Sequence, residues 1–591
     1  MMTKINGAPV SSTGVAPGGV GIKGGTTSGE LSRGNSQKSQ DVRLSNIQAA
    51  KAVADSVRTS LGPRGMDKMI CQPSGDVLIT NDGATILDKM KVQHPAGKML
   101  VQVSKSQDVV AGDGTTSVVV ICGSLLEGAL GLLGMGIHPG VVSESFGEGL
   151  RRALEVVEGM KRGVDLEDRE GLAGIAATSL GSKVVGEFRK VLAPIAVEGV
   201  LRVAGWRKIE GRGADGVVDG EMEVEGEGKG KTGEGVWVDL KDVRMVKKLG
   251  GTLEDTQLID GLVINQRPKG KIENVKNAKI AILQFCLSPP KTDLENNVVV
   301  KDYHAMDRIL KEERNYMRNI VKKIKQSGCN CVLLQKSILR DATTDLSIHY
   351  LNLAKIMVVQ DVERDEVPFL AKGLDVVPIT DIESFSADKL GKADSVVVED
   401  GLVRITGITG KAGSTVGTGT GIGSMSGASK GTQYTRTATI LVRGSNQMVL
   451  DEAERSLHDA LCVVRSLVKK RYLLPGGGAV ETEIAVRLSR AAKEVQGLQS
   501  YCLAEYARAM EVIPFTLAEN AGLSPIEVVT ELRRRHLAGE KDVGVVVRRG
   551  GVGNVREEEV EMPLLVMSSA LELATECVRM ILKIDDIVLV R

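Results

Sequence analysis

The sequence contains few aromatic residues and few histidines. Phe, Trp and Tyr together make up 3% of its 591 residues, and only six histidines are present. A surface that stacks on the bases of single-stranded nucleic acid needs more aromatic side chains than this. None of the histidines lies in an HExxH motif or in a cluster with cysteines, so we expect no catalytic zinc site.

An excess of charge of one sign is also absent. The 76 Lys and Arg residues nearly balance the 75 Asp and Glu residues, which leaves a net charge of +1. This balance gives no overall electrostatic attraction to nucleic acid or to an anionic membrane. We identify no run of about 18 apolar residues, which a membrane-spanning helix requires, and no apolar segment of a secretory signal near the N-terminus. We therefore expect no nucleic-acid partner and no membrane partner.

The eight cysteines are scattered, and only Cys329 and Cys331 lie close together in the sequence. Their spacing fits neither a redox motif nor a zinc hairpin. Most of the cysteines have apolar neighbours, which favours reduced thiols in the core. This use of cysteine is typical of a cytoplasmic protein.

Glycine, in contrast, is abundant, with 69 residues. Many of the glycines lie in three segments that have few large apolar side chains: 1–40, 205–235 and 407–430. Such segments have little to bury on folding. We expect a disordered tail at 1–40, with order beginning near Val42, and surface insertions at 205–235 and 407–430.

Apolar periodicity and length both predict a multidomain chain. A helix is predicted from Asn46 to Leu61. Further helices are predicted in the C-terminal third, at 449–470, 479–493, 498–512, 525–535 and 564–581. Between these helical ends, strands are predicted at 279–283, 331–334, 357–359 and 376–378. The first and last segments are therefore expected to pack as one discontinuous, mainly α-helical domain around an α/β middle.

Three segments carry residues that suit phosphate and a hard cation. In Leu61-Gly62-Pro63-Arg64-Gly65, the glycines let backbone N–H groups approach an anion, although Gly-Pro also simply ends a helix. In AGDGTTS (111–117), the Asp suits a cation and the hydroxyls suit phosphate oxygens, although a Thr or Ser helix cap after a turn gives the same pattern. Asn81-Asp82-Gly83 is also a common turn signal. The residues alone leave these alternatives open.

Together with other segments, these three resemble the group II chaperonins, in the same order along nearly the whole chain. The matching segments are SLGPRGMDKM (60–69), TNDGATIL (80–87), AGDGTTSVVV (111–120), KKLGGT (247–252), ERSLHDAL (454–461), LPGGGAVE (474–481) and LKIDDIV (582–588). Three further segments resemble one particular subunit of the eukaryotic cytosolic chaperonin. They are KSILRDA (336–342), AMEVIPFTLAENAGLSPI (509–526) and VTELRRRH (529–536).

The resemblance implies the chaperonin fold. A mainly α-helical discontinuous equatorial domain is then joined through an α/β intermediate domain to an α/β apical domain. The implied equatorial segments are 41–164 and 473–591, and the implied intermediate segments are 165–250 and 395–472. The implied apical domain is 251–394, with a helical protrusion at about 289–325.

The resemblance also implies an ATPase site that uses ATP and Mg²⁺. Asp113 corresponds to the magnesium ligand of the family, and Gly477 corresponds to backbone that approaches the nucleoside. The residues that are implied to contact the nucleotide phosphates are Leu61, Gly62, Pro63, Gly114, Thr115, Thr116 and Ser117.

Two acids and a lysine are implied to carry the chemistry. Asp82 corresponds to an acid near the γ-phosphate, and Asp459 corresponds to an intermediate-domain carboxylate that activates the attacking water. Lys183 corresponds to a lysine that senses the γ-phosphate. One position departs from the family pattern: Met562 replaces the acid that holds the ribose, and Glu561 lies one residue earlier.

The implied function is that of a subunit in an ATP-driven double-ring chaperonin, which encloses and folds non-native proteins. The implied partners are seven other paralogous chaperonin subunits in a hetero-oligomeric ring, together with non-native client proteins. Two alternatives stay open. One is a catalytically weak subunit that mainly contributes ring structure and client contacts, and the other is a free-standing metal-dependent phosphohydrolase.

Overall fold

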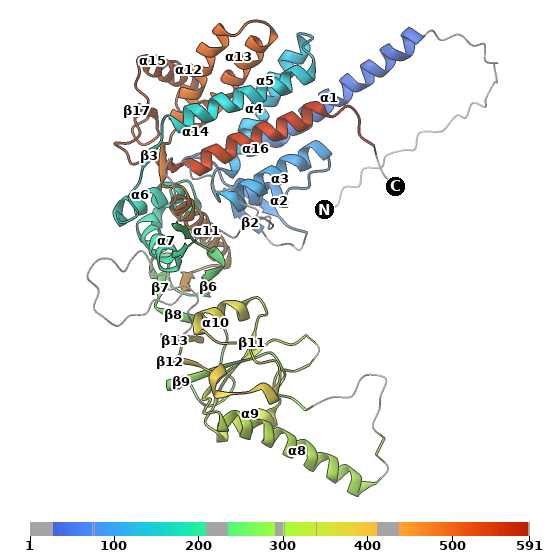
Figure 1. Cartoon of the computed structure of the whole chain (residues 1–591), viewed down its shortest axis with the longest axis vertical. Coiled ribbons are helices and arrows are strands. Elements are labelled where there is room, and N and C mark those ends of the chain that lie inside the picture. Colours follow the sequence, from blue (N-terminus) through green and yellow to red (C-terminus); the bar gives the residue numbers. More distant parts are fainter. Residues whose placement is uncertain are drawn as a thin grey trace, which may run out of the picture.

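The structure is a computed structural model that describes residues 28–588 except 74, 76, 209–233, 290–298, 301, 339 and 410–436. Figure 1 shows three units in a row, with a helical unit at one end, an α/β unit at the other and a smaller unit between them. Each unit has its own core of buried apolar residues. The predicted fold class is therefore confirmed. We call the three the equatorial, intermediate and apical units.

Both ends of the chain build the equatorial unit. In Figure 1 the blue N-terminal helices pack against the red and orange C-terminal ones, and α1 and α16 are in contact. Its helices are α1 (Ser28–Arg58), α2 (Gly83–Lys89), α3 (Pro95–Val110), α4 (Thr115–Gly134), α5 (Pro139–Glu158), α12 (Ala479–Glu494), α13 (Leu498–Met510), α14 (Val512–Asn520), α15 (Pro525–Leu537) and α16 (Leu564–Lys583). Its strands are β1 (Lys68–Cys71), β2 (Val77–Thr80), β3 (Arg162–Gly163), β15 (Tyr472–Pro475), β16 (Val543–Val546), β17 (Gly551–Asn554) and β18 (Glu561–Pro563).

Helix α4 lies at the centre of this unit. Its sequence is apolar on nearly every face, and α1, α3, α13 and α16 pack around it. A helix that is apolar all round is stable in water only when it is buried. By length and composition alone α4 could cross a membrane, so the prediction that the chain has no such apolar run is wrong. In this structure the apolar surface of α4 is largely buried in the core of the equatorial unit.

Local sequence sets several helix starts. Helices α3 and α5 both begin with Pro, whose fixed φ suits the first helical position. The preceding His94 and His138 accept hydrogen bonds on Nδ1 from the next free backbone N–H groups. Helix α1 begins at Ser28, inside the segment predicted as a disordered tail and well before the expected start at Asn46. Residues 1–27 lie outside the described residues.

In the part of the chain that the structure describes, the intermediate unit combines three α-helices with a small mixed sheet. Its helices are α6 (Arg169–Leu180), α7 (Arg189–Val203) and α11 (Gln447–Lys469). Strand β14 (Ala438–Gly444) pairs in parallel with β6 (Val243–Leu249) and antiparallel with β7 (Gln257–Ile259). The predicted insertion at 205–235 begins and ends in paired strands, β4 (Gly205–Lys208) and β5 (Glu234–Trp237). Residues 209–233 between them lie outside the described residues.

A six-stranded sheet forms the apical unit, in the order β11-β10-β9-β12-β13-β8. Its strands are β8 (Gly261–Ile264), β9 (Asn274–Leu283), β10 (Cys331–Gln335), β11 (Met357–Val362), β12 (Gly391–Glu399) and β13 (Leu402–Thr409). Its helices are α8 (Tyr303–Gln326), α9 (Asp345–Leu353) and α10 (Glu366–Leu374). Successive residues of β9 belong to two different cores, so both faces of the sheet are covered. No strand forms at 376–378; only Ile379 makes an isolated bridge, to Leu283.

Two domain boundaries differ from those expected. The boundary expected at 395 falls inside β12, which pairs with both β9 and β13, so the apical unit continues to Thr409. The insertion expected at 407–430 therefore begins inside β13, and residues 410–436 lie outside the described residues. At the other boundary, Gly250 and Gly251 have φ of 113° and 85°, but β7 still pairs within the intermediate sheet.

Candidate active site

The start of α4 is arranged to meet an anion. Its N-cap is Gly114, with φ of 76°, and no side chain caps the first backbone N–H groups of the helix. The predicted alternative of a Thr or Ser cap is therefore not the one formed. Asp113 precedes the cap, and its Oδ1 accepts from the Gly114 N–H at 2.7 Å. Thr115, Thr116 and Ser117 form the first turn, where free N–H groups and the helix dipole favour negative charge.

Asp82 joins this helix start to a second one. It caps α2, accepting from the Thr85 N–H at 2.9 Å, and its Oδ1 accepts from the Thr115 hydroxyl at 3.0 Å. A Cβ at Gly83 would lie 2.5 Å from Thr116 Oγ1, so the two helix starts can meet only with glycine there. Burial alone would raise the pKa of Asp82, but the charge of Lys183 and the hydrogen bonds to Asp82 lower it below its usual value.

The intermediate unit contributes a buried ion pair. Lys183 follows α6 and Asp459 lies on α11; their Nζ and Oδ2 atoms are 2.5 Å apart, with side chains 8% and 9% exposed. Burial alone would lower the pKa of Lys183, but Asp459, Asp82 and Asp113 raise it, so the lysine stays charged. Burial raises the pKa of Asp459 well above its usual value, although Lys183 opposes this rise.

The charges of three carboxylates therefore act on one ammonium group, and Asp459 is in direct contact with it. Asp82 and Asp113 come from the equatorial unit, and Lys183 and Asp459 come from the intermediate unit. This surplus of negative charge and the oxygen-only donors fit a hard divalent cation such as Mg²⁺. Within the described residues, no three His, Cys, Asp or Glu side chains form a complete metal cage. A site with few protein ligands is typical of Mg²⁺, which takes its other ligands from phosphate and water.

A cavity of about 560 Å³ lies next to these groups, between the equatorial and intermediate units. Pro63 and Gly477 line it from the equatorial side, and Gly181 and Ser182 line it from the intermediate side, directly before Lys183. Gly477 has φ of 62°, and its backbone approaches the cavity beside Val545, whose N–H donates to the Gly477 carbonyl at 2.8 Å. The volume suits a ligand of nucleotide size.

Two hydrogen bonds cross from one unit to the other at this cavity. The Asn81 amide donates to the Ser182 carbonyl at 3.2 Å, and the Thr178 hydroxyl donates to the Glu559 carbonyl at 3.0 Å. Both join an equatorial residue to the segment that ends in Lys183. The position of Lys183 therefore depends on contact between the two units.

A family model for the TCP-1/cpn60 chaperonin family matches residues 53–591. The chain belongs to this chaperonin family. It is 52% identical over 564 residues to T-complex protein 1 subunit delta of Arabidopsis thaliana, a match that covers 94% of this chain and 96% of the relative. It is 50% identical over 582 residues to the Bos taurus protein of the same name, with 98% of each chain covered. The predicted resemblance to group II chaperonins is confirmed, and the particular subunit that three segments resemble is the delta subunit.

Of the predicted site residues of this chaperonin chain, Pro63 and Gly477 line the cavity, and the others are not part of its lining. Glu561 is on β18 and lies 3.7 Å from Arg162, while its neighbour Met562 packs against the equatorial core. Leu61 is also buried in that core, and its carbonyl accepts from the Asn520 side chain at 2.8 Å. Neither residue is among those that line the cavity.

The cavity has lining residues that the sequence analysis did not single out. The acids are Glu558 and Glu559, and the bases include Arg189, Lys190 and Arg548. The sequence signal that could have pointed to these acids is the run of three glutamates at 557–559, close to Met562, where the chain departs from the family pattern. This run does not show which glutamates line the cavity, because the direction of each side chain depends on the loop that follows β17.

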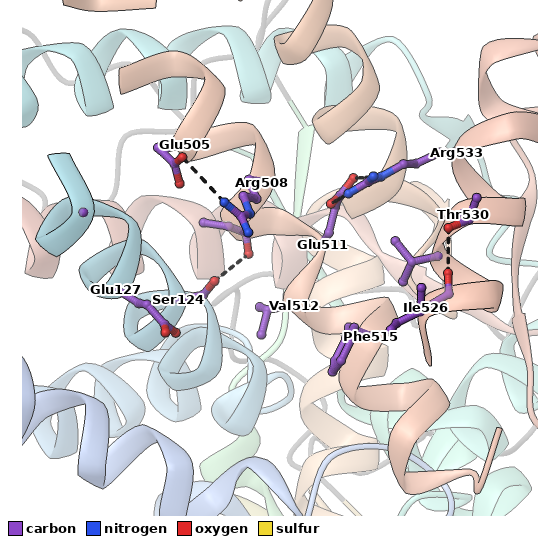
Figure 2. Close-up of a pocket in the computed structure, with 13 residues that line it drawn as sticks. Ser124, Glu127, Glu505, Arg508, Glu511, Val512, Phe515, Ile526, Thr530 and Arg533 are labelled. Atoms are coloured by element: carbon purple, nitrogen blue, oxygen red, sulfur yellow. Dashed lines mark hydrogen bonds and ion pairs between the residues drawn. The ribbon is translucent and has the colours of Figure 1, made fainter. Parts of the chain in front are cut away.

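A second cavity, of about 570 Å³, lies between α4, α13, α14 and α15 of this chaperonin chain (Figure 2). It contains none of the predicted site residues. Its polar groups satisfy one another: Arg533 pairs with Glu511, and the Ser124 hydroxyl donates to the Ala509 carbonyl at 3.1 Å. We therefore do not assign the nucleotide to this cavity.

Proposed function

We propose that this chain is an ATP-hydrolysing subunit of a cytoplasmic, hetero-oligomeric, double-ring chaperonin, in which it assembles with seven paralogous subunits. Family membership and the delta-subunit relatives support the chaperonin role in protein folding. The observation that carries the ATPase proposal is the Lys183–Asp459 pair, which the intermediate unit presents to the acids and helix start of the equatorial unit.

The phosphates of ATP are held by backbone and hydroxyl groups in this proposal. Gly62 and Pro63 form the turn after α1, where φ of 88° at Gly62 requires glycine. The N–H groups and hydroxyls of Thr115 and Thr116, in the first turn of α4, would bind phosphate oxygens. Asp113 would hold Mg²⁺, which supplies positive charge that neutralises the phosphate oxygens.

Hydrolysis needs a base for water and a cation for the γ-phosphate. Asp459 accepts the proton of the attacking water, and its raised pKa makes it a stronger base than an ordinary aspartate. Lys183 remains protonated and stabilises the negative charge that moves onto the phosphate oxygens. Asp82 attracts the Lys183 ammonium group by its charge and accepts a hydrogen bond from the Thr115 hydroxyl.

The division of these groups between two units couples motion to chemistry. Asp113 and Asp82 belong to the equatorial unit, whereas Lys183 and Asp459 belong to the intermediate unit. The set is complete only when the two units are in contact, so closure of the subunit controls hydrolysis.

Non-native clients are proposed to contact the apical unit. The buried residues of α8 lie in its C-terminal half, while its N-terminal half exposes apolar side chains that include Tyr303, Met306, Ile309 and Leu310. An exposed apolar surface of this kind marks an interaction site. In Figure 1, α8 lies at the end of the molecule opposite the equatorial unit, as a protrusion that closes the chamber would require.

The native particle tests this proposal. A ring subunit migrates with a particle of roughly 1 MDa, because sixteen chains of about 62.9 kDa assemble, and the particle releases phosphate from ATP in the presence of Mg²⁺. A free-standing phosphohydrolase would instead be active as a monomer. ATPase activity in the monomer fraction would contradict the proposal.

A catalytically weak subunit is the second candidate. It is favoured by one observation, namely that Met562 packs into the core and Glu561 lies against Arg162, so neither lines the cavity. Nucleotide occupancy separates the candidates. A weak subunit is empty in the purified particle at ATP concentrations that fill the other subunits, whereas an active one contains nucleotide.

A further inference from the structure

Helix α11 is fixed to the equatorial unit by an arginine two turns beyond Asp459. Arg465 Nη2 donates to the carbonyls of Val109 and Val110, at 3.1 and 3.2 Å. These residues end α3, where the last carbonyls have no partner inside the helix and carry the negative end of its dipole. The guanidinium therefore joins the intermediate unit to the end of an equatorial helix.

Between Asp459 and Arg465, the same helix contacts the Asp113 loop. A Cβ added to Gly112 would lie 2.1 Å from Cys462 Cβ, so the Gly112 backbone lies directly against Cys462. Asp459, Cys462 and Arg465 are spaced three residues apart and thus lie on neighbouring turns of α11. One helix therefore carries the catalytic acid, a contact with the metal-ligand loop and a contact with the helix that precedes this loop.

The equatorial unit holds the same loop from its own side. Gln107 is buried, and its Nε2 donates to the Asp113 carbonyl at 2.9 Å and to the Val566 carbonyl at 3.1 Å. Its Oε1 accepts from the Ser569 hydroxyl at 2.9 Å. These bonds lie within the equatorial unit and persist when the intermediate unit moves away. The contacts of Arg465 and Cys462 do not, because they cross between the units.

We propose that Arg465 is a positioning residue for ATP hydrolysis. By binding the end of α3, it sets the position of α11 along the equatorial unit, so that Asp459 reaches the site while Cys462 packs against Gly112. The inference rests on the proposed function. Its consequence is that loss of Arg465 slows the chemical step and leaves ATP binding in place, because the phosphate-binding groups are equatorial.

Hydrolysis must be measured on this chain alone, since neighbouring subunits of the particle also turn over ATP. The probe is 8-azido-ATP labelled with ³²P at either the α- or the γ-phosphate. It is crosslinked to the assembled particle by light, and this chain is then separated by electrophoresis. The α-label measures nucleotide binding, and loss of the γ-label with time measures hydrolysis.

Arg465→Ala is the main variant, and Arg465→Gln replaces it if the alanine variant does not assemble. We expect loss of the γ-label to slow about tenfold, the effect of removing one charge-assisted contact, with unchanged half-saturation of the α-label. Arg465→Lys, which keeps the charge at the α3 end, restores part of the rate. The matched control is Arg490→Ala, because Arg490 also donates to a helix end, the Leu537 carbonyl at 3.5 Å, but within the equatorial unit.

The outcomes distinguish failure of the positioning role of Arg465 from failure of the proposed ATPase function. An unchanged hydrolysis rate in both Arg465→Ala and Arg465→Gln overturns the positioning role alone. The same conclusion follows if Arg490→Ala slows hydrolysis equally, or if the change lies only in half-saturation or in assembly. A wild-type chain that binds the α-labelled probe and keeps its γ-label overturns the proposed function, and this inference with it.

Discussion

The intermediate unit makes two junctions. At one of them both partners of an ion pair are buried, and at the other two ion pairs each have one exposed partner. Towards the equatorial unit, Lys183 and Asp459 are almost fully buried. Towards the apical unit, Lys372 pairs with Asp242, and Arg443 lies 2.8 Å from Asp400, which is 66% exposed. Both junctions thus contain ion pairs, but their surroundings differ.

The difference indicates what each junction does. A buried charge costs several kcal/mol in desolvation, so a buried pair is weak evidence for stability and better evidence for a site. An exposed pair contributes about 0–1 kcal/mol and breaks easily. We therefore expect a reaction centre at the equatorial junction and a movable joint at the apical junction.

Replacing the predicted metal ligand should produce the largest effect. Asp113→Ala is expected to abolish ATP turnover on this chain, a loss of about a thousandfold, because the metal contributes several kcal/mol to phosphate-charge stabilisation. The azido-ATP labelling of this chain measures it. Asp400→Ala, at the apical junction, is the control and should turn over ATP normally. Equal losses in both variants would remove the distinction between the junctions.

Replacing Asp459, the proposed general base, should slow hydrolysis and spare binding. Asp459→Ala is expected to keep α-label binding and to lose γ-label about a hundred to ten thousand times more slowly, the usual contribution of a general base. Normal phosphate release from this chain in the assembled variant would rule out the role of Asp459.

Replacing Lys183 at one junction and Lys372 at the other tests how much each ion pair stabilises its junction. Lys183→Met leaves three acids without their cation, so α11 should open more readily, by about 3–5 kcal/mol. Lys372→Met leaves one acid, Asp242, without its half-exposed partner and should change local opening by less than Lys183→Met does. Hydrogen–deuterium exchange of α11 and α10 in the particle, analysed by mass spectrometry, measures both. Similar exchange in the two variants would show that burial does not separate the junctions.

A change of pH that ionises the buried acid Glu481 should have the smallest of these effects. Glu481 in α12 is 4% exposed, and burial raises its pKa to about 7. Its protonated form is favoured in the folded state, so its contribution to stability is complete at low pH and is lost as pH rises towards and through 7. We expect α12 to be less stable at pH 8 than at pH 6 by about 1 kcal/mol. In Glu481→Gln this difference should vanish, as read by exchange of α12 at the two pH values.

The local parts of the site follow from the sequence, and the tertiary parts do not. Asp82, Asp113 and Lys183 lie in short motifs whose turn and helix starts are fixed by neighbouring residues. The orientation of Glu561 depends on the register of β18 against β15, where a shift of one residue turns each side chain to the other face. The contact of Cys462 with Gly112 has no local signal, because the two residues meet only when the units pack together.

Prediction of the fold has the same limit, since local patterns are recovered and tertiary pairing is not. The helices predicted in the C-terminal third match α11, α12, α13, α15 and α16 within a few residues, because their apolar faces repeat along the chain. Helix α14 was not predicted. The boundary expected at 395 was misplaced because β12 is an apical strand only through its pairing with β9 and β13. The start of α1 at Ser28 was missed because polar, glycine-containing sequence gives no apolar period.

The hairpin of β4 and β5 has a practical use. The backbones of Lys208 and Glu234 are paired, so the two residues that flank segment 209–233 lie about 4.8 Å apart. The entropy of closing a loop between such points grows only with the logarithm of its length. We therefore expect an affinity tag or a fluorophore inserted between β4 and β5 to be compatible with this pairing. Such an insertion gives a way to purify and follow particles that contain this chain, and it alters no residue of the candidate active site.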